Sequence, residues 1–216
     1  MHRESDISRD IGEPKILIRK TSEMPADRKN NPFFDAEIFA SAETPEDVYL
    51  PDHDEAISFS IAAHEIGHLV AEGKRHDTSI DNYEAVLAEE QRAWEKGWQY
   101  IEKYLAEYFD QAELTEIRTT FEKIKDIMLQ ATVASKDLYL ESGSMDEKND
   151  EEYDDIVRKR RVEFFEQGKG VVVKELFEKV KKCGNKKKPN WDKLVTIVTK
   201  AIKDILKDNK NQSKSV

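Results

Sequence analysis

One short stretch of the chain, "AAHEIGHLVAEG" at residues 62–73, has residue types and a spacing that could do chemistry. It places His64, Glu65 and His68 in the pattern H-E-x-x-H, among Ala, Ile, Leu and Val residues typical of the buried side of a helix. Four residues of α-helix return a side chain to the same face, about one turn further on. Two imidazoles so related can bind one Zn²⁺ ion at Zn–N distances of about 2.0–2.1 Å. The stretch therefore predicts half of a zinc site.

Glu65 is the candidate catalytic base of this site. It is adjacent to His64 in the sequence and would project beside a bound metal. A zinc ion lowers the pKa of its bound water and polarises a substrate carbonyl, so Glu65 is placed to accept the proton of that water. The alternative is a coincidence of polar residues on a helix. It would leave two histidines and a carboxylate buried without partners, which is costly.

The segments before this helix predict a small sheet. Three short apolar runs have strand character, with a polar, proline-bearing stretch between the first two and Pro45 in a turn before the third. They are "KILIRK" (15–20), "AEIFASAE" (36–43) and "DVYL" (47–50). Asp52 and Glu55 resemble a capping box at the start of the histidine helix. We therefore expect an α+β fold in which about three strands pack on the HExxH helix.

The segments after it predict further helices with apolar stripes. They begin with a glutamate-rich helix from Asn82 or Tyr83 onward, and continue over residues 111–135, 156–182 and 191–206. Residues 141–155, "ESGSMDEKNDEEYDD", are acidic and nearly free of apolar groups, which predicts a linker or mobile loop. We thus expect a domain over residues 1–140, the linker over 141–155, a basic helical region over 156–207 and a disordered tail over 208–216.

The net charge of −10 is distributed unevenly. Residues 1–155 carry 17 Lys and Arg against 38 Asp and Glu, whereas residues 156–216 carry 18 against 7. Because the basic part also has a helical apolar pattern, we expect the two parts to attract one another. The low isoelectric point, about 5.2, argues against a nucleic-acid partner despite "RKRR" at residues 158–161.

Three features bear on the compartment. No apolar run approaches the roughly 18 residues that span a bilayer. The start, "MHRESDISRD", lacks the basic-then-apolar order of a signal peptide. Cys183 is the single cysteine, which excludes an internal disulfide. We expect a cytoplasmic protein that does not contact membranes.

The stretch "HEIGHLV" resembles the active-site helix of the zincin metallopeptidases. The resemblance implies a peptide or protein substrate and one Zn²⁺ ion, with His64 and His68 as ligands and Glu65 as general base. The metzincin continuation HExxHxxGxxH is missing, since Ala71 and Lys74 occupy its last two positions.

The gluzincin subclass fits better, because its third ligand is a glutamate from a second helix roughly twenty residues on. Four glutamates of the second predicted helix are candidates: Glu84, Glu89, Glu90 and Glu95. Glu90 is preferred because it lies on an otherwise apolar stripe with Trp94, Trp98 and Ile101. Glu89 is the alternative, and His76 and Asp81 are weaker ones. The "E-x-x-A-W" arrangement is more similar to small gluzincin-type peptidases than to thermolysin.

Many gluzincins carry an acidic residue four positions after the ligand glutamate, where it orients a zinc histidine. Trp94 follows Glu90 at that distance and Ala93 follows Glu89, so the resemblance, which covers about residues 36–105, does not identify this partner. In the family a peptide pairs with the strand before the active-site helix, here "DVYL" or "AEIFASA". His76 and Tyr83 are candidates for the group that helps at the carbonyl oxygen.

The sequence favours a zinc-dependent metallopeptidase that uses a metal-activated water. One alternative is a catalytically weak or inactive zincin-fold protein that binds a partner through its helices. Another is a helical interaction protein in which the HExxH is a coincidence.

Overall fold

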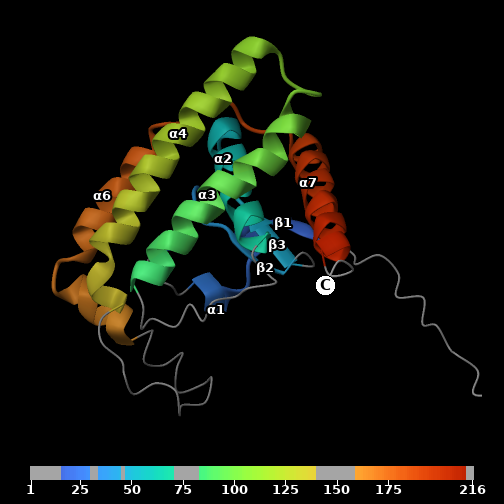
Figure 1. Ribbon diagram of the computed structural model, residues 1–216. Helices are drawn as coiled ribbons and strands as arrows, with labels where there is room; N and C mark the ends of the chain where they lie inside the picture. The colour runs from blue at the N-terminus through green and yellow to red at the C-terminus, as the bar shows by residue number, and fades with distance from the viewer. Residues whose placement is uncertain (1–15, 30–33, 45–46, 71–82, 140–158, 213–216) are drawn as a thin grey trace, which may run out of the picture.

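The computed structural model describes residues 16–29, 34–44, 47–70, 83–139 and 159–212 (Figure 1). The predicted linker at 141–155, His76 and Asp81 lie outside these ranges. The described elements, in chain order, are β1 (Ile18–Lys20), the 3₁₀ turn η1 (Thr21–Glu23), α1 (Ala26–Lys29), β2 (Ser41–Thr44), β3 (Asp47–Leu50), α2 (Glu55–Leu69), α3 (Tyr83–Leu105), α4 (Gln111–Ala134), the 3₁₀ turn η3 (Lys136–Tyr139), α6 (Gly170–Lys181) and α7 (Trp191–Gln212).

The three strands form one mixed sheet in the order β1-β3-β2, which confirms the predicted α+β fold. β3 pairs in parallel with β1 and antiparallel with β2, and it coincides with "DVYL". The strand predicted over 36–43 is wrong for residues 36–40. There the backbone N–H groups of Ile38 and Phe39 both donate to the carbonyl of Asp35, which makes a turn, so β2 begins at Ser41.

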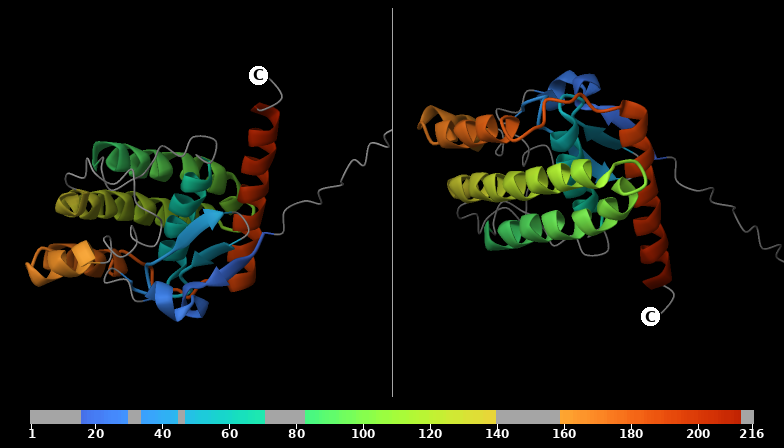
Figure 2. Two further views of the ribbon diagram at one scale, coloured as in Figure 1. Left: turned by 90° about the horizontal axis from the view of Figure 1, so that it is seen from below. Right: turned by 90° about the horizontal axis from the view of Figure 1, so that it is seen from above.

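α2 lies between the sheet and the helices α3 and α4, and α6 packs against α4 (Figures 1 and 2). Thirteen of its residues are buried, so apolar and small groups surround it on all sides. A helix with this pattern belongs to the interior of a protein. Any polar side chain on it must therefore find a partner inside the molecule.

Asp54 caps the start of α2, so the predicted cap at Asp52 is wrong by two positions. Asp54 Oδ1 accepts from the backbone N–H of Ile57 at 3.1 Å, whereas Asp52 pairs with Lys20 at 2.5 Å. The second carboxylate oxygen of Asp54 accepts from the backbone N–H of Lys186 at 2.5 Å. The loop between α6 and α7 is thus attached to the first turn of the histidine helix.

The helix predicted over 156–182 is interrupted. Residues 159–166 are helical, residues 167–169 form a turn, and α6 follows. Gly168 adopts a φ of 77°, a left-handed conformation that glycine reaches without strain and that ends many helices. The interruption folds α6 back against α4 (Figure 1).

α7 continues to Gln212, so the prediction of a disordered tail is wrong for residues 208–212. Its apolar face supplies Leu194, Val198, Ala201 and Ile205 to the same buried cluster that contains α2 and α3. None of the helices in the described ranges is long and apolar enough to cross a membrane.

Ion pairs join the acidic and basic parts, as the charge distribution predicted. Lys187 lies 2.9 Å from Glu55 and 3.0 Å from Glu113. Lys181 lies 2.9 Å from Asp35, and Lys200 pairs with Glu107. The basic helices are therefore fastened onto the acidic part of the chain along several elements.

Candidate metal centre

Small residues let α2 and α3 cross in direct contact. A Cβ atom added to Gly67 would lie 1.8 Å from the carbonyl oxygen of Ala93, and one added to Gly97 would lie 1.6 Å from that of Ala63. Both helices thus carry an alanine and a glycine four residues apart, on the faces that meet. This close crossing sets the histidines of α2 opposite the glutamates of α3.

His64, His68 and Glu90 point into one small space. The two histidine Nε2 atoms are 3.1 Å apart, and Glu90 lies 3.2 Å from His64 Nε2 and 3.7 Å from His68 Nε2. In a tetrahedral zinc site with ligand distances of about 2.0–2.1 Å, neighbouring ligand atoms are about 3.3 Å apart. The three side chains can hold one metal ion, and their spacing and donor types fit zinc.

The electrostatics of this space favour a bound cation. Burial lowers the pKa of His68, but the hydrogen bond with Glu89 and the charges of Glu90 and Glu65 outweigh it and raise that pKa to about 9. Burial raises the pKa of Glu90, whereas His64 and His68 lower it further, to about 2. Glu90 is therefore ionised at neutral pH, and positive charge is stabilised beside it, either as a proton on His68 or as a metal ion.

Glu89 lies on the outer side of His68. Its Oε1 atom is 3.5 Å from His68 Nδ1 and 3.4 Å from Arg92 Nη2. The hydrogen bond from His68 is the main cause that lowers the pKa of Glu89. A carboxylate at the second nitrogen fixes the tautomer and the ring orientation of a metal-binding histidine. Glu89, the alternative ligand, thus supplies the orienting partner that the sequence did not identify.

Trp94 orients the other histidine by stacking. Its ring lies 4.3 Å from that of His64, centroid to centroid, at an interplanar angle of 23°. His64 Nδ1 is buried and has no hydrogen-bond partner among the described residues. The position where many gluzincins carry an acidic partner therefore holds an aromatic one. Trp94 and Trp98 are both buried in the core, and Phe121 of α4 packs against both.

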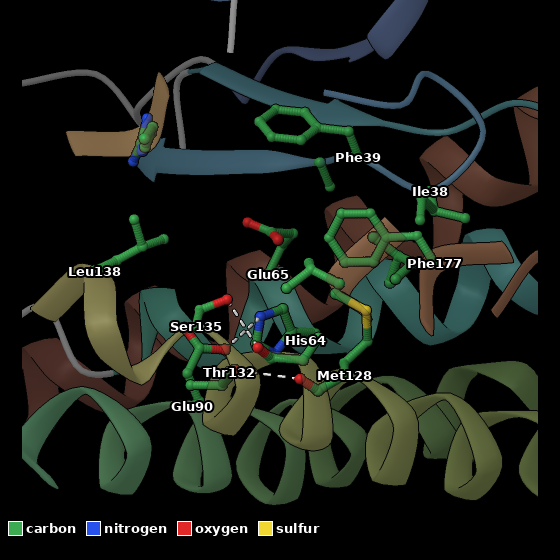
Figure 3. Close-up of a pocket in the computed structure, with 15 residues that line it drawn as sticks. Ile38, Phe39, His64, Glu65, Glu90, Met128, Thr132, Ser135, Leu138 and Phe177 are labelled. Atoms are coloured by element: carbon green, nitrogen blue, oxygen red, sulfur yellow. Dashed lines mark hydrogen bonds and ion pairs between the residues drawn. The ribbon is translucent and has the colours of Figure 1, made fainter. Parts of the chain in front are cut away.

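A cavity of about 270 Å³ opens beside the three-residue group. Figure 3 shows the carboxylate of Glu65 pointing into it from α2, next to His64. Glu65 does not belong to the group of His64, His68 and Glu90 that could hold a metal ion. Several elements contribute to the lining: Ile38, Phe39, Ala40, Ile61, His64, Glu65, Glu90, Met128, Ala131, Thr132, Ser135, Leu138, Arg161, Val173 and Phe177.

Comparison of the chain with protein-family models, curated proteins and solved structures gives no match. None of these comparisons identifies a family for the chain.

The structure brings together His64, Glu65, His68 and Glu90, but it separates two other expected features from the site. Tyr83 is not among the described residues that line the cavity, and the Nζ atom of Lys136 lies over its ring at 5.0 Å. β3 is hydrogen-bonded on both sides and cannot pair with a peptide, whereas β2 is at an edge of the described sheet.

Three cavity residues carry no signal in the sequence. Met128 on α4, Arg161 on the helical segment 159–166 and Phe177 on α6 follow the motif by sixty residues or more. α4, which carries Met128, packs directly on α2, and the return of α6 against α4 brings Phe177 to the cavity. No local sequence pattern predicts a contact between residues so far apart in the chain.

Proposed function

We propose that this protein is a zinc-dependent peptidase that hydrolyses peptide bonds. The observation that carries the proposal is the set of two imidazole nitrogens and one carboxylate, 3.1–3.7 Å apart, beside a cavity into which Glu65 points. Three protein ligands with one position left open are typical of catalytic rather than structural zinc sites.

Each residue of the site has a separate role in the proposed reaction. His64, His68 and Glu90 would hold the ion, and Glu89 and Trp94 keep the two rings in place. When bound, zinc supplies Lewis acidity, which makes water easier to deprotonate and a carbonyl carbon more electrophilic. Glu65 accepts the proton of the attacking water and passes it to the leaving amine nitrogen. The edge of β2 offers backbone groups with which an extended peptide can pair, since such groups add a strand to a sheet.

The test compares the wild type with two variants. The wild type, purified without a metal-binding tag, should contain one zinc ion per chain. Glu65→Gln should keep the zinc and the fold but lose about 10²- to 10⁴-fold in the rate of peptide cleavage, the usual contribution of a general base. His64→Ala should lose the zinc. Cleavage that survives in Glu65→Gln would contradict the proposal.

One observation favours a second candidate, a zinc-binding module that is catalytically weak and binds a partner protein. Among the described residues that line the cavity, there is no tyrosine and no histidine apart from His64 to assist at the carbonyl oxygen. Stoichiometric zinc together with no cleavage of any peptide in a diverse library would favour this candidate.

A further inference from the structure

The charged residues that line the cavity differ in whether a partner or a proposed role accounts for them. Within the described lining they are Glu65, Glu90 and Arg161. Glu90 lies against His64, and Glu65 has the role of base in the proposed function. Arg161, which comes from the helical segment 159–166, has no role in that chemistry.

Arg161 is half-buried and has no ion pair or hydrogen bond with another residue in the part of the chain that the structure describes. Other basic residues of the same region are paired: Lys169 with Asp137, and Lys181 with Asp35. A guanidinium group has five N–H donors and no acceptor, and it matches the two oxygens of a carboxylate. An arginine at the wall of a cavity that has no partner among the described residues is therefore available to bind an anionic ligand.

The rest of the wall accepts apolar groups. Phe39, Met128 and Phe177 come from three different parts of the chain and meet at this cavity (Figure 3), and Val173 of α6 also lines it. Its volume of about 270 Å³ is just below the range of about 300–1,000 Å³ typical of sites for drug-sized ligands. It has room for one bulky side chain and the groups next to it.

We propose that the cavity binds a bulky apolar side chain with a carboxylate next to it, and that Arg161 recognises this carboxylate. As a statement about substrate choice it rests on the proposed function, because a peptide so bound lies beside Glu65. The proposal that the cavity binds such a ligand does not depend on the proposed function. Two sources offer the same chemistry: the free C-terminal carboxylate of a peptide that ends in an apolar residue, and the side chain of a neighbouring Asp or Glu.

The charge balance supports an anionic ligand once a divalent cation is bound. Such a cation offsets the two carboxylates of Glu65 and Glu90, and Arg161 then leaves an excess of positive charge at the cavity wall. A hydrogen-bonded pair between an arginine and a carboxylate is also stronger than one between neutral groups.

The first experiment measures binding. The probes are N-acetyl-phenylalanine and its C-terminal amide, titrated into the zinc-loaded wild type, Arg161→Gln and Arg160→Gln. Arg160 is the matched control, since it is the adjacent residue, carries the same charge and is not part of the described lining of this cavity. The wild type and Arg160→Gln should bind the acid about 10- to 100-fold more tightly than the amide, from the usual worth of hydrogen bonds to charged groups.

Arg161→Gln should bind both probes equally. A preference for the acid that persists in Arg161→Gln would mean that the metal alone holds the carboxylate, and it would overturn the proposal. Equal binding of acid and amide by the wild type would overturn it as well.

The second experiment separates the two sources of the carboxylate. Three peptides share one sequence up to a phenylalanine. The first ends at that residue with a free carboxylate, the second ends there as an amide, and the third continues with Asp-NH₂. We expect wild-type kcat/KM to be about tenfold or more higher for the first or the third than for the second. The favoured peptide, the first or the third, identifies the source of the carboxylate. Arg161→Gln should remove its advantage in kcat/KM by raising KM.

An equal fall of kcat for all three peptides in Arg161→Gln would mean that Arg161 acts on the carbonyl oxygen, which would overturn the proposal. If the wild type cleaves none of the peptides but still prefers the acid through Arg161, the peptidase proposal fails and the binding site stands.

Discussion

The helices α2 and α7 belong to the same hydrophobic core but treat polar residues in opposite ways. α2 is buried on nearly all sides, and its histidines face carboxylates of α3 inside the molecule. α7 buries one face only and places charged residues on the other, where Asp204 pairs with Lys103 and Lys200 with Glu107. A buried polar residue on α2 requires a partner, so its presence there is informative about function. A polar residue on the outer face of α7 reflects only contact with water.

The largest expected effect concerns the glycine at the crossing of α2 and α3, compared with the glycine in the turn before α6. In Gly97→Ala the new Cβ atom would lie 1.6 Å from the carbonyl oxygen of Ala63, so the helices must separate, and we expect a loss of about 3 kcal/mol or more in the free energy of unfolding. In Gly168→Ala no described atom lies within 4 Å, and only the left-handed backbone conformation costs energy, about 1–2 kcal/mol. Urea unfolding measures both. Equal losses would show that the crossing tolerates a wider spacing.

Zinc affinity should depend on pH through His68. Its pKa of about 9 lies above the ordinary value, so the proton stabilises the metal-free fold fully below about pH 6.5, and this contribution is lost as the pH rises through 9. Zinc must displace that proton, so its affinity should rise about tenfold per pH unit up to about pH 9. Glu90, with a pKa of about 2, stays ionised throughout. Competition with a chelator at pH 6.5, 7.5 and 8.5 measures the slope, and a flat profile would contradict the assignment.

The roles of the two adjacent glutamates can be separated by substitution. Glu89→Gln should weaken zinc binding by about 10- to 100-fold, because it removes the carboxylate at His68 Nδ1 without removing a ligand. It should also flatten the dependence of zinc affinity on pH, since the hydrogen bond with Glu89 is the largest of the causes that raise the pKa of His68.

Glu90→Gln is the matched variant and should weaken zinc binding more. A larger loss of zinc in Glu89→Gln than in Glu90→Gln would mean that Glu89 is the ligand and Glu90 the orienting partner.

The smallest expected effects concern the lysines of the basic part. Lys187→Ala removes ion pairs with Glu113 and with Glu55, whose side chain is only 3% exposed, and should cost about 1–2 kcal/mol in the free energy of unfolding. Lys200→Ala removes a surface pair with Glu107 and should change that free energy by about 0.5 kcal/mol or less. Thermal unfolding of the two variants at one salt concentration makes the comparison. Equal effects would show that the burial of Glu55 does not strengthen its pair.

The sequence predicted the parts of the site that lie on regular helices. The spacing of His64 and His68 and the apolar stripe through Glu90 follow the period of 3.6 residues, so position along the helix determines the face. The sequence did not predict which side chains hold the two histidine rings in place. Those partners depend on how α2 and α3 cross, which no local pattern describes. The roles of Glu89 and Trp94 arise from that crossing.

The errors in the predicted fold occur where local hydrogen bonds or a single backbone angle compete with the apolar pattern. The turn at Asp35 shortens β2, and Gly168 divides the helix predicted over 156–182. The contribution of Phe177 to the cavity depends on the same break, because Phe177 lies on α6, which packs against α4 only after the chain reverses.

The contact between Asp54 and the backbone of Lys186 has a consequence for the order of events during protein synthesis. The HExxH segment leaves the ribosome long before the residues that complete the cap of its helix and before α7, which covers the same core. A nascent or prematurely terminated chain thus contains the zinc-binding motif but lacks the segment that fixes its first turn. We expect a finished centre only in chains that have been translated past Lys186.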